Sequence, residues 1–85
     1  MMTAAELFQR YQAWKEAVEE LDAHEPLLDI ENKPADRQKY EALINKRLEA
    51  FAAFDRPYRL VSKSVRSELQ GLISENYRRK WRTAT

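Results

Sequence analysis

The sequence predicts an all-α fold, either a small three-helix bundle or a helical hairpin followed by a long C-terminal helix. Apolar residues recur at intervals of three and four along most of the chain, which is the spacing of an amphipathic helix. The 85 residues include one glycine and three prolines, too few for the tight turns of a sheet-rich protein. A chain of this length with one modest set of apolar residues predicts a single domain over residues 1–85.

The first predicted helix covers about residues 4–23. Thr3 and Glu6 have the spacing of a capping box, in which each side chain satisfies a backbone N–H left free at the helix start. Pro26 prevents a regular continuation of the helix. The apolar side chains that share one narrow stripe of this helix are Leu7, Tyr11, Trp14, Val18 and Leu21.

The second predicted helix covers about residues 34–54. Pro34 suits its first turn, where a backbone N–H has no partner in the helix. Residues 55–57 are expected to end it, because Pro57 disfavours a helical conformation at the residue before it. The expected buried stripe is wider than that of the first helix and contains Tyr40, Leu43, Ile44, Leu48, Phe51 and Phe54.

The third predicted helix covers about residues 56–81 and is the longest. Asp55 is a favourable N-cap residue for a helix that starts there. Gly71 interrupts the helix at a cost of about 1 kcal/mol relative to alanine, which packing can offset. The expected buried stripe contains Tyr58, Val61, Val65, Leu69, Leu72 and Ile73.

The near-neutral net charge of +1 hides a strong asymmetry along the chain. Residues 1–31 hold two cations and eight anions, a net charge of −6, whereas residues 56–85 hold eight cations and two anions, a net charge of +6. The cationic, polar and aromatic side chains expected along one flank of the third helix are Arg56, Arg59, Lys63, Arg66, Gln70, Tyr77 and Trp81. We take this row as the candidate binding surface.

Three interpretations of this row compete. Tyrosine and tryptophan are typical anchors of protein interfaces, and the acidic first helix makes a second copy of the chain one possible protein partner. The same cations and rings suit the phosphates and bases of nucleic acid, which is the alternative partner. The third interpretation is a solvated flank with no binding role. The sequence favours a non-catalytic protein-interaction or regulatory module, possibly a homodimer, over a nucleic-acid-binding protein.

Two arginines occupy unusual positions in the predicted stripes. Arg47 falls in the middle of the stripe of the second helix, and Arg10 lies at the edge of the stripe of the first helix. A cation in such a place must pair with a carboxylate, extend its head to water or meet an anionic ligand. The structural interpretation of Arg47 is pairing with Asp22, Glu25 or Asp29, or extension of its long side chain past its neighbours to water, and recognition of a partner is the functional one.

The sequence indicates no catalytic, metal or cofactor site. There is no cysteine, and His24 is the only histidine, so a metal site would lack most of its usual ligands. Gly71 is the only glycine, which excludes glycine-rich phosphate-binding loops. No apolar run approaches a membrane span, and no signal peptide opens the chain. We therefore expect a cytoplasmic protein that is not an enzyme.

Overall fold

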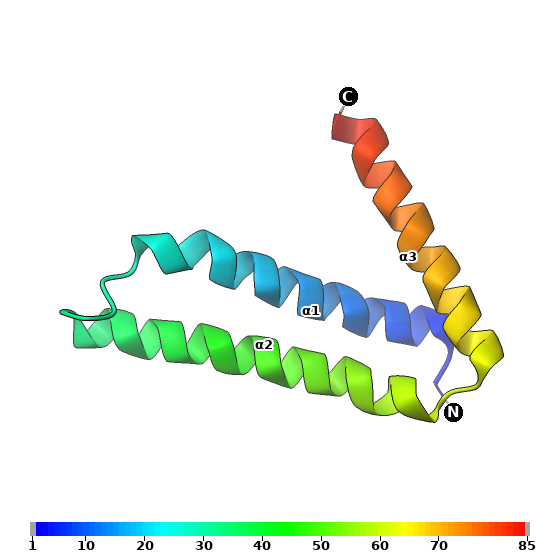
Figure 1. The fold of residues 1–85 in the computed structure, drawn as a ribbon, viewed down its shortest axis with the longest axis horizontal. Helices are drawn as coiled ribbons and strands as arrows, with labels where there is room; N and C mark the ends of the chain where they lie inside the picture. The colour runs from blue at the N-terminus through cyan, green and yellow to red at the C-terminus, as the bar shows by residue number, and fades with distance from the viewer. Residues whose placement is uncertain (1, 85) are drawn as a thin grey trace.

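The computed structural model describes residues 2–84, with side chains over residues 2–80. These residues form three α-helices, α1 (Ala4–His24), α2 (Pro34–Leu60) and α3 (Lys63–Ala84), and a short 3-10 helix, η1 (Glu25–Leu27). Helices α1 and α2 lie side by side as an antiparallel hairpin, and α3 starts near the N-terminal end of α1 and then diverges from it (Figure 1). The predicted all-α fold is confirmed, in its form of a hairpin with a long C-terminal helix.

Helix α1 begins with Thr3 as its N-cap, and one of the two backbone bonds of the predicted capping box is formed. The backbone N–H of Glu6 donates to Thr3 Oγ1 at 3.2 Å, and the Thr3 hydroxyl donates to the Glu6 carboxylate at 3.1 Å. At the other end His24 closes the helix, and Pro26 lies in η1, where its fixed φ is compatible with the tighter turn.

The connection from η1 to α2 is tied to the first turn of α2. The Asp36 carboxylate accepts a hydrogen bond from the backbone N–H of Asp29 at 2.9 Å. The Asp29 carboxylate in turn accepts bonds from the backbone and the side chain of Asn32, each at 3.2 Å. Arg37 donates back to the carbonyl oxygen of Ile30 at 3.2 Å. These bonds fix the loop against the first turn of α2, so the position of α2 relative to α1 is defined.

The predicted break at residues 55–57 is wrong, because α2 continues through Pro57 to Leu60. Pro57 has no N–H, so it leaves the carbonyl oxygen of Ala53, four residues earlier, without its helical donor. Arg10 Nη1 of α1 donates to that oxygen at 2.8 Å. A donor from the neighbouring helix thus replaces the bond that the proline removes.

The actual break lies at Val61 and Ser62. Val61 is extended, with φ −85° and ψ 160°, and it ends α2. The Ser62 hydroxyl accepts a hydrogen bond from the backbone N–H of Val65 at 3.3 Å, which makes Ser62 the N-cap of α3. Arg56 and Arg59 therefore lie on α2, and the predicted row does not run along a single helix.

The three helices share a core where they meet. Its buried members are Ala4, Leu7, Val61 and Leu69, and the side chains of Leu7 and Leu69 are fully buried. A second buried set, Ala17, Leu21 and Leu43, lies between α1 and α2 farther along the hairpin. We call the region around the first set the corner, and it confirms that Leu7 and Leu69 belong to the buried stripes.

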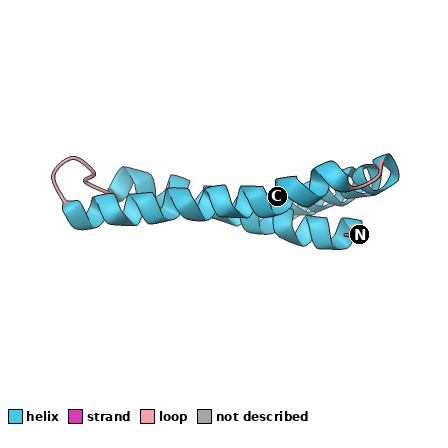
Figure 2. Cartoon of the chain, turned by 90° about the horizontal axis from the view of Figure 1, so that it is seen from below, coloured by secondary structure: helices cyan, strands magenta, loops and turns pink. Residues whose placement is uncertain are grey.

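The molecule is a thin layer of helices. Its extents are 49 × 36 × 13 Å, and its radius of gyration is 15.9 Å. A compact chain of this length has a radius of gyration of about 12 Å. The edge-on view shows the helices in a single layer, with no helix stacked on the hairpin (Figure 2). Because α3 lies beside the hairpin, it leaves the hairpin surface uncovered.

Candidate interaction surface

A network of aromatic rings joins α1 to α2. Tyr11 and Trp14 of α1 both meet the ring of Phe54, with centroids 5.8 and 6.2 Å apart. Trp14 also meets Phe51 edge-to-face at 5.0 Å, and Tyr58 stacks on Phe54 at 5.3 Å. Such pairs contribute about 0.5–1.5 kcal/mol each beyond their buried area, so they hold the two helices in register.

Beyond the corner, apolar side chains of the hairpin remain at the surface. Leu48 is 54% exposed and Phe51 is 39% exposed, although the sequence predicts both in the buried stripe. The expectation for these two residues is wrong because no described segment packs over this part of α2. We name the region the open apolar face and define it by Trp14, Val18, Ile44, Leu48 and Phe51, of which the first three are half-buried.

Arg47 lies next to this face, three residues after Ile44 and four before Phe51, so it shares their side of the helix. Its side chain is half-buried, and no hydrogen bond or ion pair links it to any residue that the structure describes. The expected pairing with Asp22, Glu25 or Asp29 is not formed. Arg47 therefore places a cation without a carboxylate beside apolar surface.

Arg10, the other unusual arginine, has an internal structural role. Its guanidinium donates to the Ala53 carbonyl oxygen that Pro57 leaves free, as described above. The same contact places Arg10 and Pro57 in a shallow depression on the polar side of the hairpin, together with Glu49, Ala52 and Arg56. The geometry accounts for Arg10 without a ligand.

Arg66 is also engaged within the chain. Its Nε and Nη2 atoms donate to the carbonyl oxygens of Tyr58 and Arg59, at 3.2 and 3.0 Å. Its guanidinium lies 5.0 Å from the centroid of the Tyr58 ring, in cation–π geometry. A cation that binds the last carbonyl groups of α2 also interacts favourably with the helix dipole. Arg66 thus fixes the angle between α2 and α3.

The other members of the predicted row are divided between two helices. On α2, Arg59 pairs with Asp55 at 2.8 Å, and Arg56 is exposed. On α3, Lys63 and Gln70 are exposed, and Tyr77 is 61% exposed. Trp81 belongs to α3, but its side chain lies outside the described residues. The structure therefore brings Lys63, Gln70 and Tyr77 to one helix and separates the α2 arginines from them.

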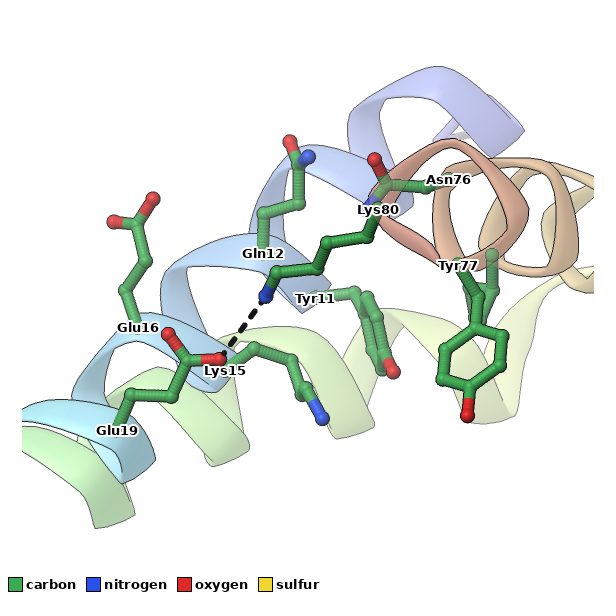
Figure 3. A pocket seen from close by; sticks show the side chains of 9 residues that line it. Tyr11, Gln12, Lys15, Glu16, Glu19, Asn76, Tyr77 and Lys80 are labelled. Carbon is green, nitrogen blue, oxygen red and sulfur yellow. Dashed lines mark hydrogen bonds and ion pairs between the residues drawn. The ribbon is translucent and has the colours of Figure 1, made fainter. Parts of the chain in front are cut away.

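A wedge-shaped cavity of about 280 Å³ opens where α3 diverges from α1 (Figure 3). The rings of Tyr11 and Tyr77 lie on one side of it, and Gln12 and Glu16 point to the other (Figure 3). Lys80 Nζ spans the wedge to Glu19 Oε1 at 3.4 Å. The full lining is Tyr11, Gln12, Lys15, Glu16, Glu19, Ile73, Asn76, Tyr77 and Lys80. The lining is mixed in polarity and balanced in charge, which gives the wedge no preference for anions or cations.

Three titratable side chains of the hairpin, His24, Lys46 and Glu20, form contacts within the chain. His24 Nδ1–H donates to the backbone carbonyl oxygen of Glu20 at 2.8 Å, one turn earlier. Lys46 Nζ binds Glu20 Oε2 at 2.6 Å. The hydrogen bond and the charge of Lys46 lower the pKa of Glu20 below its ordinary value. Within the described residues, no group of three or more His, Cys, Asp or Glu side chains is arranged to hold a metal ion.

Comparison with protein-family models, with characterised proteins and with solved structures finds no match to this chain. No helix among the described residues combines the length and the apolar character needed to span a bilayer. The geometry of the candidate surface is that of a helical hairpin with apolar side chains exposed on one side.

Proposed function

We propose that this chain is a non-catalytic protein-interaction or regulatory module that binds its partner through the open apolar face. The observation that supports the proposal is the exposure of Leu48 and Phe51 beside Trp14, on a single layer of helices. Fully burying a leucine or phenylalanine side chain contributes about 1.5–3 kcal/mol, so a partner that covers this face gains substantial free energy.

The accessible area of the chain supports the same proposal. It is 6651 Å², whereas a compact monomer of 10.1 kDa has about 5,300 Å². The excess of roughly 1,300 Å² exceeds the ~800 Å² that each partner contributes to an interface of standard size. The chain thus exposes enough additional surface for one such interface.

Arg47 also suits a protein partner. It lies on α2 beside the apolar side chains of the face. Arginine and aromatic residues are enriched in protein interfaces. We therefore assign the centre of the binding surface to the hairpin, and keep Lys63, Gln70 and Tyr77 of the predicted row as exposed α3 residues outside that centre.

Site-specific photo-crosslinking in cells tests the proposal. A photoreactive phenylalanine derivative at position 48 should give discrete protein adducts. The matched control is position 60 on the same helix, because Leu60 is 82% exposed but lies half a turn away from Phe51 at 100° per residue. Equal labelling from the two positions, or none from position 48, would contradict the proposal.

Nucleic acid is the second candidate partner, and one observation favours it. Arg56 and Lys63 are exposed and form no ion pair with another described residue, so both cations are accessible to phosphate. Binding through them should weaken by about 0.9 log unit per log unit of salt for each phosphate contact on duplex DNA. Lys63→Ala should then reduce the slope by about one contact in a gel-shift salt titration. An absence of binding at low salt would exclude non-specific nucleic acid binding.

A further inference from the structure

We infer that the partner on the open apolar face is a second copy of this chain, packed hairpin against hairpin about a two-fold axis. The inference rests on the proposed function, because it names the partner for the same surface. Three observations carry it: the thickness of the layer, the extent of the uncovered area, and the distribution of charge along the chain.

The first observation is the 13 Å thickness of the molecule. Stable domains bury their apolar faces between at least two layers of secondary structure, and packed helices lie 8–10 Å apart. The described part of this chain has one layer, with a core shared by all three helices at the corner around Leu7 and Leu69 and a smaller buried set between α1 and α2. A second copy stacked on the open apolar face supplies the missing layer and gives the four-helix arrangement common among small helical proteins.

The second observation is that the chain exposes more area than a compact chain of its mass. An isologous dimer uses the same patch on both copies, so each copy must offer at least ~800 Å² for a standard interface. The chain as a whole exposes roughly 1,300 Å² more than a compact chain, so an interface of standard size would bring its exposed area closer to that of a compact protein. Each contact of Leu48 or Phe51 is then made twice, which doubles its contribution.

The third observation is the charge distribution. Seven of the eight acidic residues in residues 1–31 lie from Glu16 onward, toward the loop end of the hairpin, whereas residues 56–85 carry a net charge of +6. We place the two-fold axis between the two layers, perpendicular to the long direction of the hairpins. The loop end of one copy then covers the corner of the other. The acidic segment of one copy then lies near α3 of its partner, and the opposite charges favour this arrangement over a parallel one.

Sedimentation equilibrium of the purified chain tests the inference. The expected mass is twice 10.1 kDa at micromolar concentration and low salt. Leu48→Glu should yield a monomer, since it places a charge at the centre of the interface. Leu60→Glu is the matched control, because it makes the same change at an exposed leucine outside the face and should leave the dimer intact.

Circular dichroism checks that each variant keeps its helices. If Leu48→Glu loses helicity, Leu48→Ala replaces it and should weaken the dimer at least tenfold. A wild-type chain that is monomeric at 100 µM would overturn the inference, and so would a Leu48→Glu variant that remains dimeric. Crosslinking from position 48 separates the two proposals: adducts to other proteins alone would remove the second copy but keep the proposed function, and no adducts would remove both.

Discussion

The corner and the open apolar face are built from the same residue types, but they differ in how far their leucines are buried and whether their arginines are hydrogen-bonded. In the corner, Leu7 and Leu69 are fully buried, and Arg10 and Arg66 each donate to backbone carbonyl oxygens. On the open apolar face, Leu48 is more than half exposed, and Arg47 has no bond to any described residue. The corner completes its own interactions, whereas no described segment covers the face.

The contrast separates residues that maintain the fold from residues that the described fold leaves exposed or unpaired. An arginine within an apolar stripe is by itself ambiguous, because it can cap, pair or recognise a ligand. The carbonyl oxygens that receive Arg10 and Arg66 assign both to the fold. Arg47 is the one unusual arginine for which the described residues offer no internal acceptor.

The largest expected effect on the free energy of unfolding comes from comparing two leucine-to-alanine substitutions, one in the corner and one on the open apolar face. Leu69→Ala should lower the free energy of unfolding by about 2–5 kcal/mol, because it leaves a cavity in the corner. Leu48→Ala should cost under about 0.5 kcal/mol under conditions where the chain is a monomer, as expected for an exposed site. Urea denaturation measures both values. Equal losses would show that the two leucines have similar surroundings.

The connection between α2 and α3 gives a smaller effect. Arg66→Met removes two hydrogen bonds and the contact with the Tyr58 ring, and it should cost about 1–2 kcal/mol. Arg66→Lys should recover little of the loss, because an ammonium group cannot span two carbonyl oxygens and stack on a ring. Thermal denaturation distinguishes the two variants. Full recovery by lysine would indicate that charge alone matters.

The bond between Arg10 and Ala53 gives an effect of about 1 kcal/mol. Arg10→Met should destabilise the wild-type chain by this amount, because the carbonyl oxygen left free by Pro57 loses its donor. In a Pro57→Ala background the backbone N–H of residue 57 supplies that donor, so Arg10→Met should cost less. A double-mutant cycle measures the coupling. Additive effects would contradict the compensation that we describe.

Sequence patterning was sufficient for the helices whose signals are local. Thr3 caps the start of α1, and Pro34 begins α2 as predicted. The break between α2 and α3 was misplaced because the local effect of Pro57 is offset by Arg10, a residue 43 positions away in sequence. The correct break had its own local signal in Ser62, whose hydroxyl caps α3.

The apolar side of each helix was predictable, but how much of that side is buried was not. Helical periodicity identifies the apolar side of each helix, and Leu7, Leu21 and Leu43 are buried accordingly. Periodicity does not say which element covers that side. Leu48 and Phe51 were expected in the buried stripe of the second helix, but α3 is held beside α1 by the corner and by the Arg66 contacts and does not cover them. The exposure of the candidate face thus depends on an interhelical angle that no local pattern specifies.

The smallest effect concerns the ion pair between Lys46 and Glu20, near the loop end of the hairpin. Lys46 lowers the pKa of Glu20 in the folded chain, so folding favours the ionised carboxylate. The resulting stabilisation is present above the ordinary glutamate pKa of about 4.3 and is lost as pH falls below it through the lowered value. Lys46 is exposed and Glu20 is partly exposed, so salt should screen the pair.

Thermal melting as a function of pH measures this contribution. At neutral pH and low salt, Glu20→Gln should lower the melting temperature slightly, and the difference from wild type should vanish in strong acid or at high salt. Glu41→Gln is the control, because it removes an exposed carboxylate of α2 that pairs with no described cation. A Glu20→Gln difference that persists in acid would mean that the side chain stabilises the hairpin by packing rather than by charge. The ion pair would then contribute no charge-dependent stability to the loop end of the hairpin. In the proposed dimer, this is the end that meets the basic α3 of the second copy.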